Sequence, residues 1–344
     1  MNASDETAAG VATTPARPTL KTIAYLTGLG VTTVSRALND APDIGRATKE
    51  RVKAVADQIG YRPNRAGVRL RTGKNNVIAM ILSIEREGLG LNSNLIYGVS
   101  EYLANTSYNL SVAPYDTGND PLDPVRYIVE MGSADGVIFS RTEPQDRRAR
   151  YLAERGFPFA THGRTELDMV HPYVDFDNDA YAEQAVDRLA AKGRSRIALI
   201  VPPLNLTYAR HTIDGFVRGI ERHNLTEIPI RTVDTDSPHE AIEAEVARLM
   251  RSPRRADGFV CGSAFSAIAV TAGAEASGYI IGRDFDVVLK ESFDIMRKFR
   301  PTIQSAQEDF RRAGQRLAEF LVRRIDGAPV EELQWLDQPD VWTG

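Results

Sequence analysis

The spacing of apolar residues changes once along the chain, close to residue 75. Before that point apolar side chains recur three or four positions apart, which places them on one face of a helix. Three such stretches are Leu20, Ile23 and Ala24; Val34, Ala37 and Leu38; and Val52, Val55, Ala56 and Ile59. Gly28 separates the first two and permits a tight turn. The pattern predicts a helix-turn-helix whose small core is closed by a third helix over 48–59.

Beyond residue 75, short runs rich in β-branched residues alternate with longer amphipathic stretches. We expect strands over 77–82, 109–113, 136–140, 158–161, 197–201, 258–261 and 285–289. We expect helices over 94–105, 124–131, 146–155, 178–192, 209–222, 239–250, 265–277 and 311–325. This alternation is typical of parallel sheets covered by helices, and the number of repeats is enough for two α/β subdomains.

Charge divides the chain at the same place. The whole chain has a net charge of −4. Residues 19–74 contain eleven basic and four acidic side chains, a net charge of +7, which leaves −10 for residues 75–344. Nucleic-acid affinity comes largely from neutralising phosphates, so the cationic segment predicts a polyanionic partner. A helix-turn-helix suits the major groove of double-stranded DNA, although a hairpin in an ordinary helical bundle would show the same helical pattern.

The first seventy residues resemble the DNA-binding head and hinge of the LacI/GalR family of bacterial transcription regulators. Family heads carry a motif of the form T-x-x-x-x-A-x-x-x-G-V-S-x-x-T-V-S-R-x-x-N. The matching residues are Thr19, Ala24, Gly28, Thr33, Val34, Ser35, Arg36 and Asn39. The resemblance implies an all-α helix-turn-helix domain and a hinge helix, followed by an α/β core like a periplasmic binding protein, with two parallel-sheet subdomains.

The resemblance also implies roles for individual residues. Arg36 would reach a guanine edge. Val31 and Thr32 occupy the specificity positions, and because neither has a long donor, we expect contact with a thymine methyl or recognition of shape. The other expected DNA contacts are Thr19, Thr33, Ser35 and Asn39 in the helices and Asn64, Arg65 and Leu70 in the hinge.

Two glycines depart from the family pattern. Gly30 replaces the Ser that caps the recognition helix, at a cost of roughly a few tenths of a kcal/mol. Gly67 replaces an Ala and disfavours helix by about 1 kcal/mol, so we expect the hinge to be disordered off DNA. Leu70 matches the family leucine that is wedged into the minor groove at the operator centre; packing on a helix face is the alternative.

These patterns give the expected domain boundaries. A disordered leader without the character of an export signal occupies 1–18, the helix-turn-helix domain 19–62, the hinge 63–75 and the effector-binding and dimerisation domain 76–344. In that last domain, about 76–177 and 310–337 form the N-subdomain, and about 178–306 and 338–344 form the C-subdomain. The tail after residue 327 shows no heptad pattern, so we expect a homodimer on a palindromic operator.

Ligands of such folds bind at the carboxyl ends of the strands, in the cleft between subdomains. The candidate contacts are therefore residues next to strand ends or where the chain crosses between subdomains. They are Arg141, Glu143, His162, Arg164, Tyr208, Arg210, Ser263, Phe265, Lys290, Glu291 and Phe310. Charged groups can bind vicinal hydroxyls and aromatic rings can cover a pyranose, and the resemblance implies a sugar effector. Each charged residue alone could equally be a solvated loop charge, and Phe310 a core residue.

Three departures leave the identity of the effector open. Thr212 stands where the family commonly has an Arg, Gly262 and Ser263 replace an Asn-Asp pair, and Glu291 replaces an Asp beside an unusual Lys. A larger oligosaccharide and an anionic sugar derivative both fit these changes. We expect the effector to release the operator, as in most of the family, and an activator or a co-effector-dependent regulator is the alternative.

Other functional classes have little support. No apolar run is long enough to span a bilayer, the single Cys261 provides neither a disulfide nor a cysteine-based zinc site, and the five histidines lack metal-ligand spacing. Glu143 and Glu291 are the only suggestive catalytic pair, so we expect no enzyme, no cofactor and no metal. An exported sugar-binding protein would need an export signal and would not need a cationic head. We therefore expect a cytoplasmic repressor of carbohydrate genes.

Overall fold

The computed structural model describes residues 18–62, 73–83, 91–116, 118–293 and 296–343. The chain divides into a unit that ends at Asn75, here called the head, and a unit from Asn76 to Gly344, here called the core unit. Four residues singled out in the hinge lie outside the described residues: Asn64, Arg65, Gly67 and Leu70.

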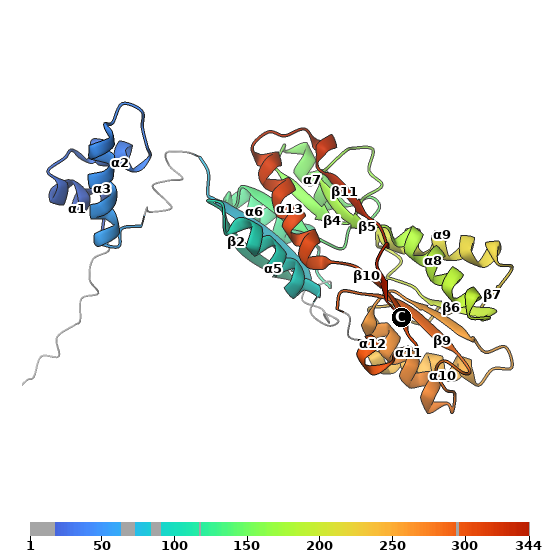
Figure 1. The fold of residues 1–344 in the computed structure, drawn as a ribbon. Helices are drawn as coiled ribbons and strands as arrows, with labels where there is room; N and C mark the ends of the chain where they lie inside the picture. Colours follow the sequence, from blue (N-terminus) through green and yellow to red (C-terminus); the bar gives the residue numbers. More distant parts are fainter. Residues whose placement is uncertain (1–17, 63–72, 84–90, 117, 294–295, 344) are drawn as a thin grey trace, which may run out of the picture. The chain divides into compact units, whose positions relative to one another are not determined.

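Three helices form the described part of the head: α1 (Leu20–Thr27), α2 (Val31–Leu38) and α3 (Arg46–Gln58) (Figure 1). Their buried apolar side chains make one cluster of Ile23, Ala24, Val34, Ala37, Val52 and Ala56. The first helix begins at a capping box between Thr19 and Thr22 and ends at Gly28, whose φ of +66° is left-handed. A residue with a Cβ would be strained in that turn. The predicted three-helix arrangement is confirmed.

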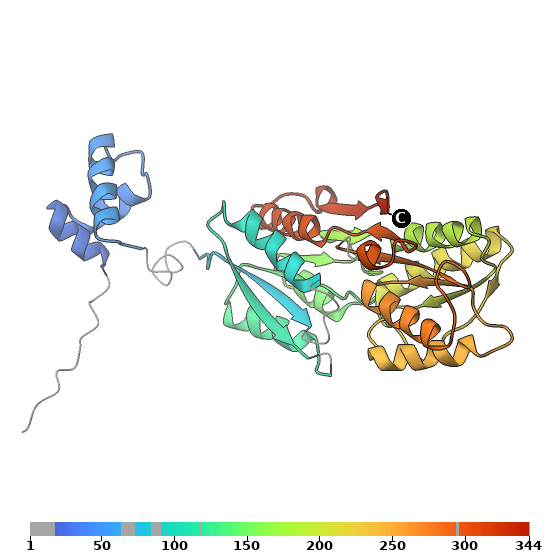
Figure 2. The ribbon, with the colours of Figure 1, turned by 60° about the horizontal axis from the view of Figure 1, so that its bottom comes forward.

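The first half of the core unit is a parallel sheet with the strand order β11-β5-β4-β3-β1-β2. Its strands are β1 (Val77–Ser83), β2 (Asn109–Tyr115), β3 (Gly136–Phe139), β4 (Phe159–His162), β5 (Tyr173–Phe176) and β11 (Gln334–Asp337). One face is covered by α5 (Leu91–Leu103) and α13 (Phe310–Ile325), and the other by α6 (Leu122–Met131) and α7 (Arg147–Glu154) (Figure 2). Burial on both faces accounts for the continuous apolar run of β1.

The second half has the strand order β12-β10-β9-β8-β6-β7. Its strands are β6 (Arg196–Ile200), β7 (Thr226–Glu227), β8 (Gly258–Cys261), β9 (Asp286–Glu291), β10 (Gln304–Gln307) and β12 (Trp342–Thr343). Its covering helices are α8 (Asn178–Ala191) and α9 (Thr207–Arg222) on one face, and α10 (His239–Met250) and α11 (Ala264–Ala276) on the other. The β10–β12 pair is antiparallel and the other pairs are parallel. The short elements α12 (Met296–Phe299) and η1 (Val330–Glu332) follow β9 and α13, respectively.

The predicted strands and helices of the core unit are present, and the expectation of two parallel-sheet subdomains is confirmed. Five short strands were not predicted: β5, β7, β10, β11 and β12. The composition of β10, Gln-Ser-Ala-Gln, favours no strand, and this segment is extended because it pairs with β9 on one side and β12 on the other. The tail after residue 327, for which no strand was predicted, supplies one strand to each sheet.

The chain crosses between the two sheets three times, after β5, after β10 and after β11. Near the second crossing, α13 lies against α5 at two glycines, Gly98 and Gly314. A Cβ at position 314 would lie 2.3 Å from the carbonyl oxygen of Leu95, so the helices can approach this closely only with glycine there. Because of these crossings, residues of both halves lie close together beside the carboxyl ends of the strands.

Candidate functional site

The first residues of α2, the second helix of the head, are exposed. It buries Val34 and Ala37 but leaves Val31 and Thr32 exposed, with Val31 at 41%. Gly30 is the N-cap and makes no side-chain hydrogen bond, as the sequence predicted. In a helix-turn-helix, the N-terminal residues of this helix are the ones that contact base edges.

Arg36 lies at the surface of the same helix and is paired with an acid. Its Nη2 is 2.6 Å from Oδ1 of Asp43, and both side chains are about half exposed. An ion pair this exposed contributes little to stability. The guanidinium can therefore exchange Asp43 for an acceptor on DNA at small cost.

The remaining described candidates for DNA contact make local hydrogen bonds. Thr19 caps α1 through its hydroxyl. Asn39 follows the last residue of α2, and its Nδ2 donates to the Ser35 carbonyl oxygen at 2.6 Å. Thr33 and Ser35 are half-buried.

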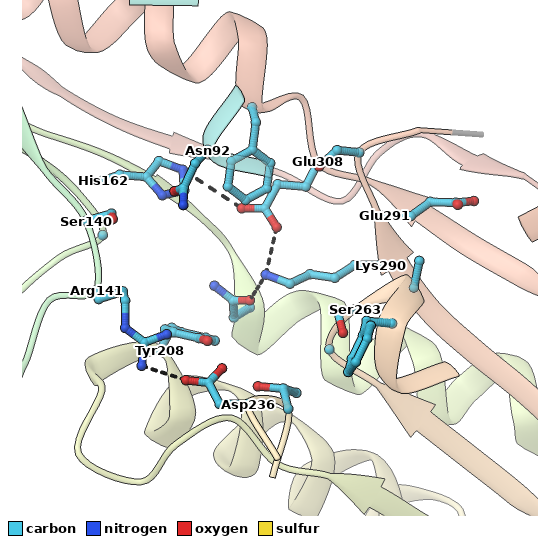
Figure 3. Close-up of a pocket in the computed structure, with 18 of the residues that line it drawn as sticks. Asn92, Ser140, Arg141, His162, Tyr208, Asp236, Ser263, Lys290, Glu291 and Glu308 are labelled. Carbon is cyan, nitrogen blue, oxygen red and sulfur yellow. Dashed lines mark hydrogen bonds and ion pairs between the residues drawn. The ribbon is translucent and has the colours of Figure 1, made fainter. Parts of the chain in front are cut away.

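A cavity of about 220 Å³ is lined by both halves of the core unit, beside the carboxyl ends of their strands (Figure 3). Eight of the expected effector contacts line it: Arg141, His162, Tyr208, Ser263, Phe265, Lys290, Glu291 and Phe310. Further lining residues that the sequence analysis missed are Asn92, Asp175, Asn178, Thr235, Asp236, Ser292, Phe293 and Glu308. Polar groups and aromatic rings from both halves thus converge on one space.

A buried set of charged and polar groups forms one wall of the cavity. The Nζ of Lys290 lies 2.7 Å from Oε2 of Glu308 and donates to Oδ1 of Asn178 at 2.7 Å, and the Lys and Glu side chains are only 11% and 7% exposed. The other carboxylate oxygen of Glu308 is 4.0 Å from Nε2 of His162 (Figure 3). Burial lowers the pKa of His162, and the charge of Glu308 opposes this shift. The imidazole is therefore neutral near pH 7.

Arg141 reaches from the first half of the core unit to the second. Its Nη2 lies 2.6 Å from Oδ2 of Asp236. Burial acts to lower the pKa of Arg141, but the hydrogen bond and charge of Asp236 outweigh burial and raise it, so the guanidinium stays charged. The φ of Arg141 is +56°, a conformation that a non-glycine residue keeps only with support. Arg148, buried against Asp146, supplies that support by donating to the Arg141 carbonyl oxygen at 2.8 Å.

Aromatic rings and hydroxyls complete the lining. Tyr208, Phe265 and Phe310 contribute rings. Burial raises the pKa of Tyr208, so its hydroxyl remains a donor at neutral pH. The Oγ of Ser292 is buried and has no hydrogen-bond partner among the described residues. A buried polar group of this kind is satisfied by bound water or by a ligand, and a polyhydroxyl compound suits it.

Three of the expected effector contacts, Glu143, Arg164 and Arg210, are not among the residues that line the cavity. All three lie nearby, but their charged groups form hydrogen bonds or ion pairs with other polar residues of the core unit. The partners are Asn205 for Glu143, Glu166 for Arg210, and Asp175 and His211 for Arg164.

These side chains miss the cavity because of the direction in which each one points from its helix or loop. Tyr208 lines the cavity, and Arg210 lies two residues further along α9, about 200° around the helix. Glu143 lies two residues beyond Arg141 in the loop after β3. Proximity to a strand end placed these residues near the cleft but could not fix the side on which they point.

Glu291 lines the cavity, but its carboxylate is bound elsewhere. Its Oε1 accepts from the hydroxyl of Ser305 at 2.7 Å, and its Oε2 from the backbone N–H of Met296 at 3.3 Å. Figure 3 shows its side chain directed away from the other labelled groups. Glu291 therefore holds β9 to β10 and is a poor candidate for effector contact.

Two of the missed residues pair with the two cations of the described lining. Glu308 lies two residues before Phe310, in the segment that crosses between the halves. Its place in that crossing segment was an available signal, because the same reasoning led to Phe310. Asp236 lies in the loop after β7, a two-residue strand with no sequence pattern. Only the folded structure brings Asp236 to Arg141, 95 residues away in the chain.

Two kinds of site are absent from the described part of the chain. Among these residues, no group of three His, Cys, Asp or Glu side chains is placed to hold a metal ion. No described helix combines the length and apolar character required to cross a membrane.

Two family descriptions match this sequence. Residues 19–64 match "Bacterial regulatory proteins, lacI family", and residues 186–342 match "Periplasmic binding protein-like domain". The chain is 30% identical over 321 residues to the HTH-type transcriptional regulator AglR of Rhizobium meliloti (strain 1021), which covers 89% of this chain and 87% of AglR.

Solved structures share the fold. A complex of the transcriptional regulator CelR with cellobiose has a TM-score of 0.67 at 24% identity and covers 94% of this chain and 97% of that one. The Lac repressor dimer bound to operator and the anti-inducer ONPF has a TM-score of 0.81 at 20% identity, and the match covers 94% of this chain and 96% of that one. The chain therefore belongs to the LacI family of bacterial regulatory proteins and is a DNA-binding transcriptional regulator, not an enzyme.

Proposed function

We propose that this regulator is a cytoplasmic repressor of genes for carbohydrate uptake or breakdown. In this proposal a homodimer binds a palindromic operator and is released when a sugar binds in the cavity of the core unit. The observation that carries the proposal is the cavity itself, because side chains from both halves of the core unit converge on it. A ligand held by both halves favours one angle between them, and such a difference in affinity is what couples a ligand to a conformational change.

The lining supports a sugar as that ligand. Carboxylate, amide and hydroxyl groups can exchange hydrogen bonds with sugar hydroxyls, and aromatic rings can cover the apolar face of a pyranose. We propose that Arg141, His162, Tyr208, Ser263, Phe265, Lys290 and Phe310 contact the effector. The related CelR forms a complex with cellobiose in the structure named above.

The head supports the operator contacts. We propose that Val31, Thr32 and Arg36 reach base edges and that Thr19, Thr33, Ser35 and Asn39 position the head on the phosphates. By the family resemblance, Asn64 and Arg65 contact DNA and Leu70 enters the minor groove. The Lac repressor in the structure named above is a dimer on its operator.

The test is a selection of genomic DNA fragments on the purified full-length protein at fixed moderate salt, repeated with a panel of sugars. Recovery of a few palindromic sites that are lost with one sugar supports the proposal. Sites recovered only in the presence of the sugar would instead indicate a regulator that needs its effector to bind. Uniform weak retention of all fragments, with no effect of any sugar, would contradict both readings.

A substitution in the hinge tests the proposed role of the hinge separately from that of the cavity. Leu70→Ala should weaken operator binding, while sugar binding and dimerisation stay intact. Unchanged operator affinity would contradict the minor-groove role of Leu70.

A further inference from the structure

We infer that the cavity selects an uncharged polyhydroxyl effector and rejects phosphorylated or acidic sugars, because the two cationic side chains of its described lining are already bound to carboxylates. This inference rests on the proposed function and names the class of its effector. It decides between the two classes that the sequence left open, a larger oligosaccharide and an anionic sugar derivative.

Most of the hydrogen-bond donors of Lys290 already have partners. An ammonium group has three N–H donors, and two of them meet Glu308 and Asn178, each at 2.7 Å. A phosphate bound to the third donor would lie beside the Glu308 carboxylate, which disfavours it, and a closer pairing with Lys290 would displace Glu308. That carboxylate, 7% exposed, would then be buried without its cation, which is strongly unfavourable.

Arg141 is also paired with a carboxylate, and its remaining N–H donors lie beside that negative charge. Its guanidinium is 2.6 Å from Asp236. Asp236 is also drawn beside Tyr208 in the lining (Figure 3). An anion placed against Arg141 would therefore meet the charge of Asp236 at short range, and like charges at close quarters disfavour binding.

Both cations of the described lining are paired with carboxylates. The described lining holds two cations, Arg141 and Lys290, and four acids, Asp175, Asp236, Glu291 and Glu308. Arg164 lies outside the lining and pairs with Asp175 at 2.7 Å. The Glu291 carboxylate is bound by Ser305 and by the backbone N–H of Met296, so the two remaining acids match the two cations. The pKa of His162 is lowered by burial, so this residue adds no positive charge near pH 7. A sugar phosphate carries close to two negative charges at that pH, and no unpaired cation of the described lining would balance them.

Neutral hydroxyl groups meet no such obstacle. Each hydroxyl can donate to a carboxylate oxygen and accept from Lys290 or Arg141 without separating either ion pair. The unpartnered hydroxyl of Ser292 is a further site for one. The paired charges thus serve as fixed donors and acceptors for hydroxyl groups, while the carboxylate in each pair disfavours an anion beside it.

The experiment measures binding of matched probes to the full-length protein by isothermal titration calorimetry. The neutral probes are glucose, galactose, maltose, cellobiose and lactose. The anionic probes are glucose 6-phosphate, galactose 6-phosphate, the 6-phosphates of the disaccharides, and glucuronate. We expect one neutral sugar to bind at least about a hundredfold more tightly than its charged counterpart.

Two substitutions test the cause. Glu308→Gln removes one negative charge and releases Lys290, and Asp236→Asn does the same for Arg141. Each should narrow the preference for the neutral sugar at least about tenfold. Glu240→Gln, at an exposed site on α10, makes the same change in net charge and should leave the preference unchanged. A thermal melt of each variant verifies that it is folded, and Asp236, 37% exposed, is the more tolerant site.

The outcomes separate this inference from the proposed function. Tighter binding of a phosphate or of glucuronate, with release of operator DNA, would overturn the inference and leave the sugar-responsive regulator standing. An unchanged preference in both Glu308→Gln and Asp236→Asn would also overturn it. Binding of no probe in either set, with operator binding intact, would remove the sugar function and the inference together.

Discussion

Charged side chains have opposite surroundings in the head and in the cavity of the core unit. Arg46 and Lys53 of the head are 92% and 47% exposed even though each is paired with an acid. Lys290 and Glu308 of the cavity are 11% and 7% exposed. An exposed charge remains available to a partner such as DNA, whereas the two charges of a buried pair interact mainly with each other. The difference shows that the surroundings of a basic residue, and not its presence in the sequence, decide whether it attracts an anion.

The largest expected difference between the head and the cavity is in the salt dependence of ligand affinity. Between about 50 and about 200 mM salt, operator affinity should fall about 10³-fold if the head and hinge neutralise about six phosphates. Sugar affinity should change less than about twofold, because buried pairs are screened much less. Fluorescence anisotropy of labelled operator and calorimetry of the sugar measure the two effects. Equal salt sensitivity would mean that the cavity uses exposed charge as the head does.

Removing one partner of the buried pair should have the next largest effect. Lys290→Met leaves Glu308 without its cation and should lower the free energy of unfolding by about 3 kcal/mol. Both tryptophans, Trp335 and Trp342, lie in the core unit. Their fluorescence in urea therefore reports this unit alone.

The matched control is Arg126→Met in the same unit. Arg126 pairs with Asp123, but the side chains are 44% and 66% exposed, so the loss should stay below about 1 kcal/mol. A similar loss in both variants would show that burial does not distinguish the two pairs.

Acid should destabilise the core unit and spare the head. All five histidines follow residue 75, and burial lowers the pKa of both His162 and His171. Below about pH 6.5 the unfolded chain binds more protons at these sites than the folded chain, so stability falls as pH decreases. The slope should not exceed about 1.4 kcal/mol per pH unit for each histidine.

Urea titrations from about pH 7.5 to about pH 5.5 measure this slope. His162→Gln and His171→Gln should each flatten it. His223→Gln, at a partly exposed site paired with Asp187, is the control and should retain the slope of the unsubstituted protein. Stability that rises with acid over this range would mean that the buried histidines are charged.

The smallest predicted effect is at the cap of α2. Gly30→Ser should stabilise the head by roughly a few tenths of a kcal/mol, because Ser can accept a hydrogen bond from the first turn. A Cβ at position 30 meets only Thr33 Oγ1, at 3.8 Å, so the side chain fits. Gly28→Ser is the opposite control, since φ of +66° should cost it about 1 kcal/mol. Hydrogen exchange of the α2 amides measures both, and slower exchange in Gly28→Ser would contradict this account.

The sequence by itself determined the three helices of the head, the alternation of strands and helices in the core unit and the family. Those features depend on local periodicity and on a motif of neighbouring residues, such as Thr33, Ser35 and Arg36, that can be read without tertiary contacts. Eight of the eleven expected cavity residues also line the cavity, because the carboxyl end of a parallel strand faces the cleft wherever the strand is placed.

Tertiary structure alone decided which charges meet. Asp236 faces Arg141 and Glu308 faces Lys290 only after the loops and crossings are folded, and Arg210 turns away because of its angle on α9. Strands such as β10 exist only through pairing with neighbours. Periodicity reports the face of an element that is buried, but ion pairing depends on distances between elements far apart in the chain. The electrostatic character of the cavity is therefore a property of the fold and not of any one segment.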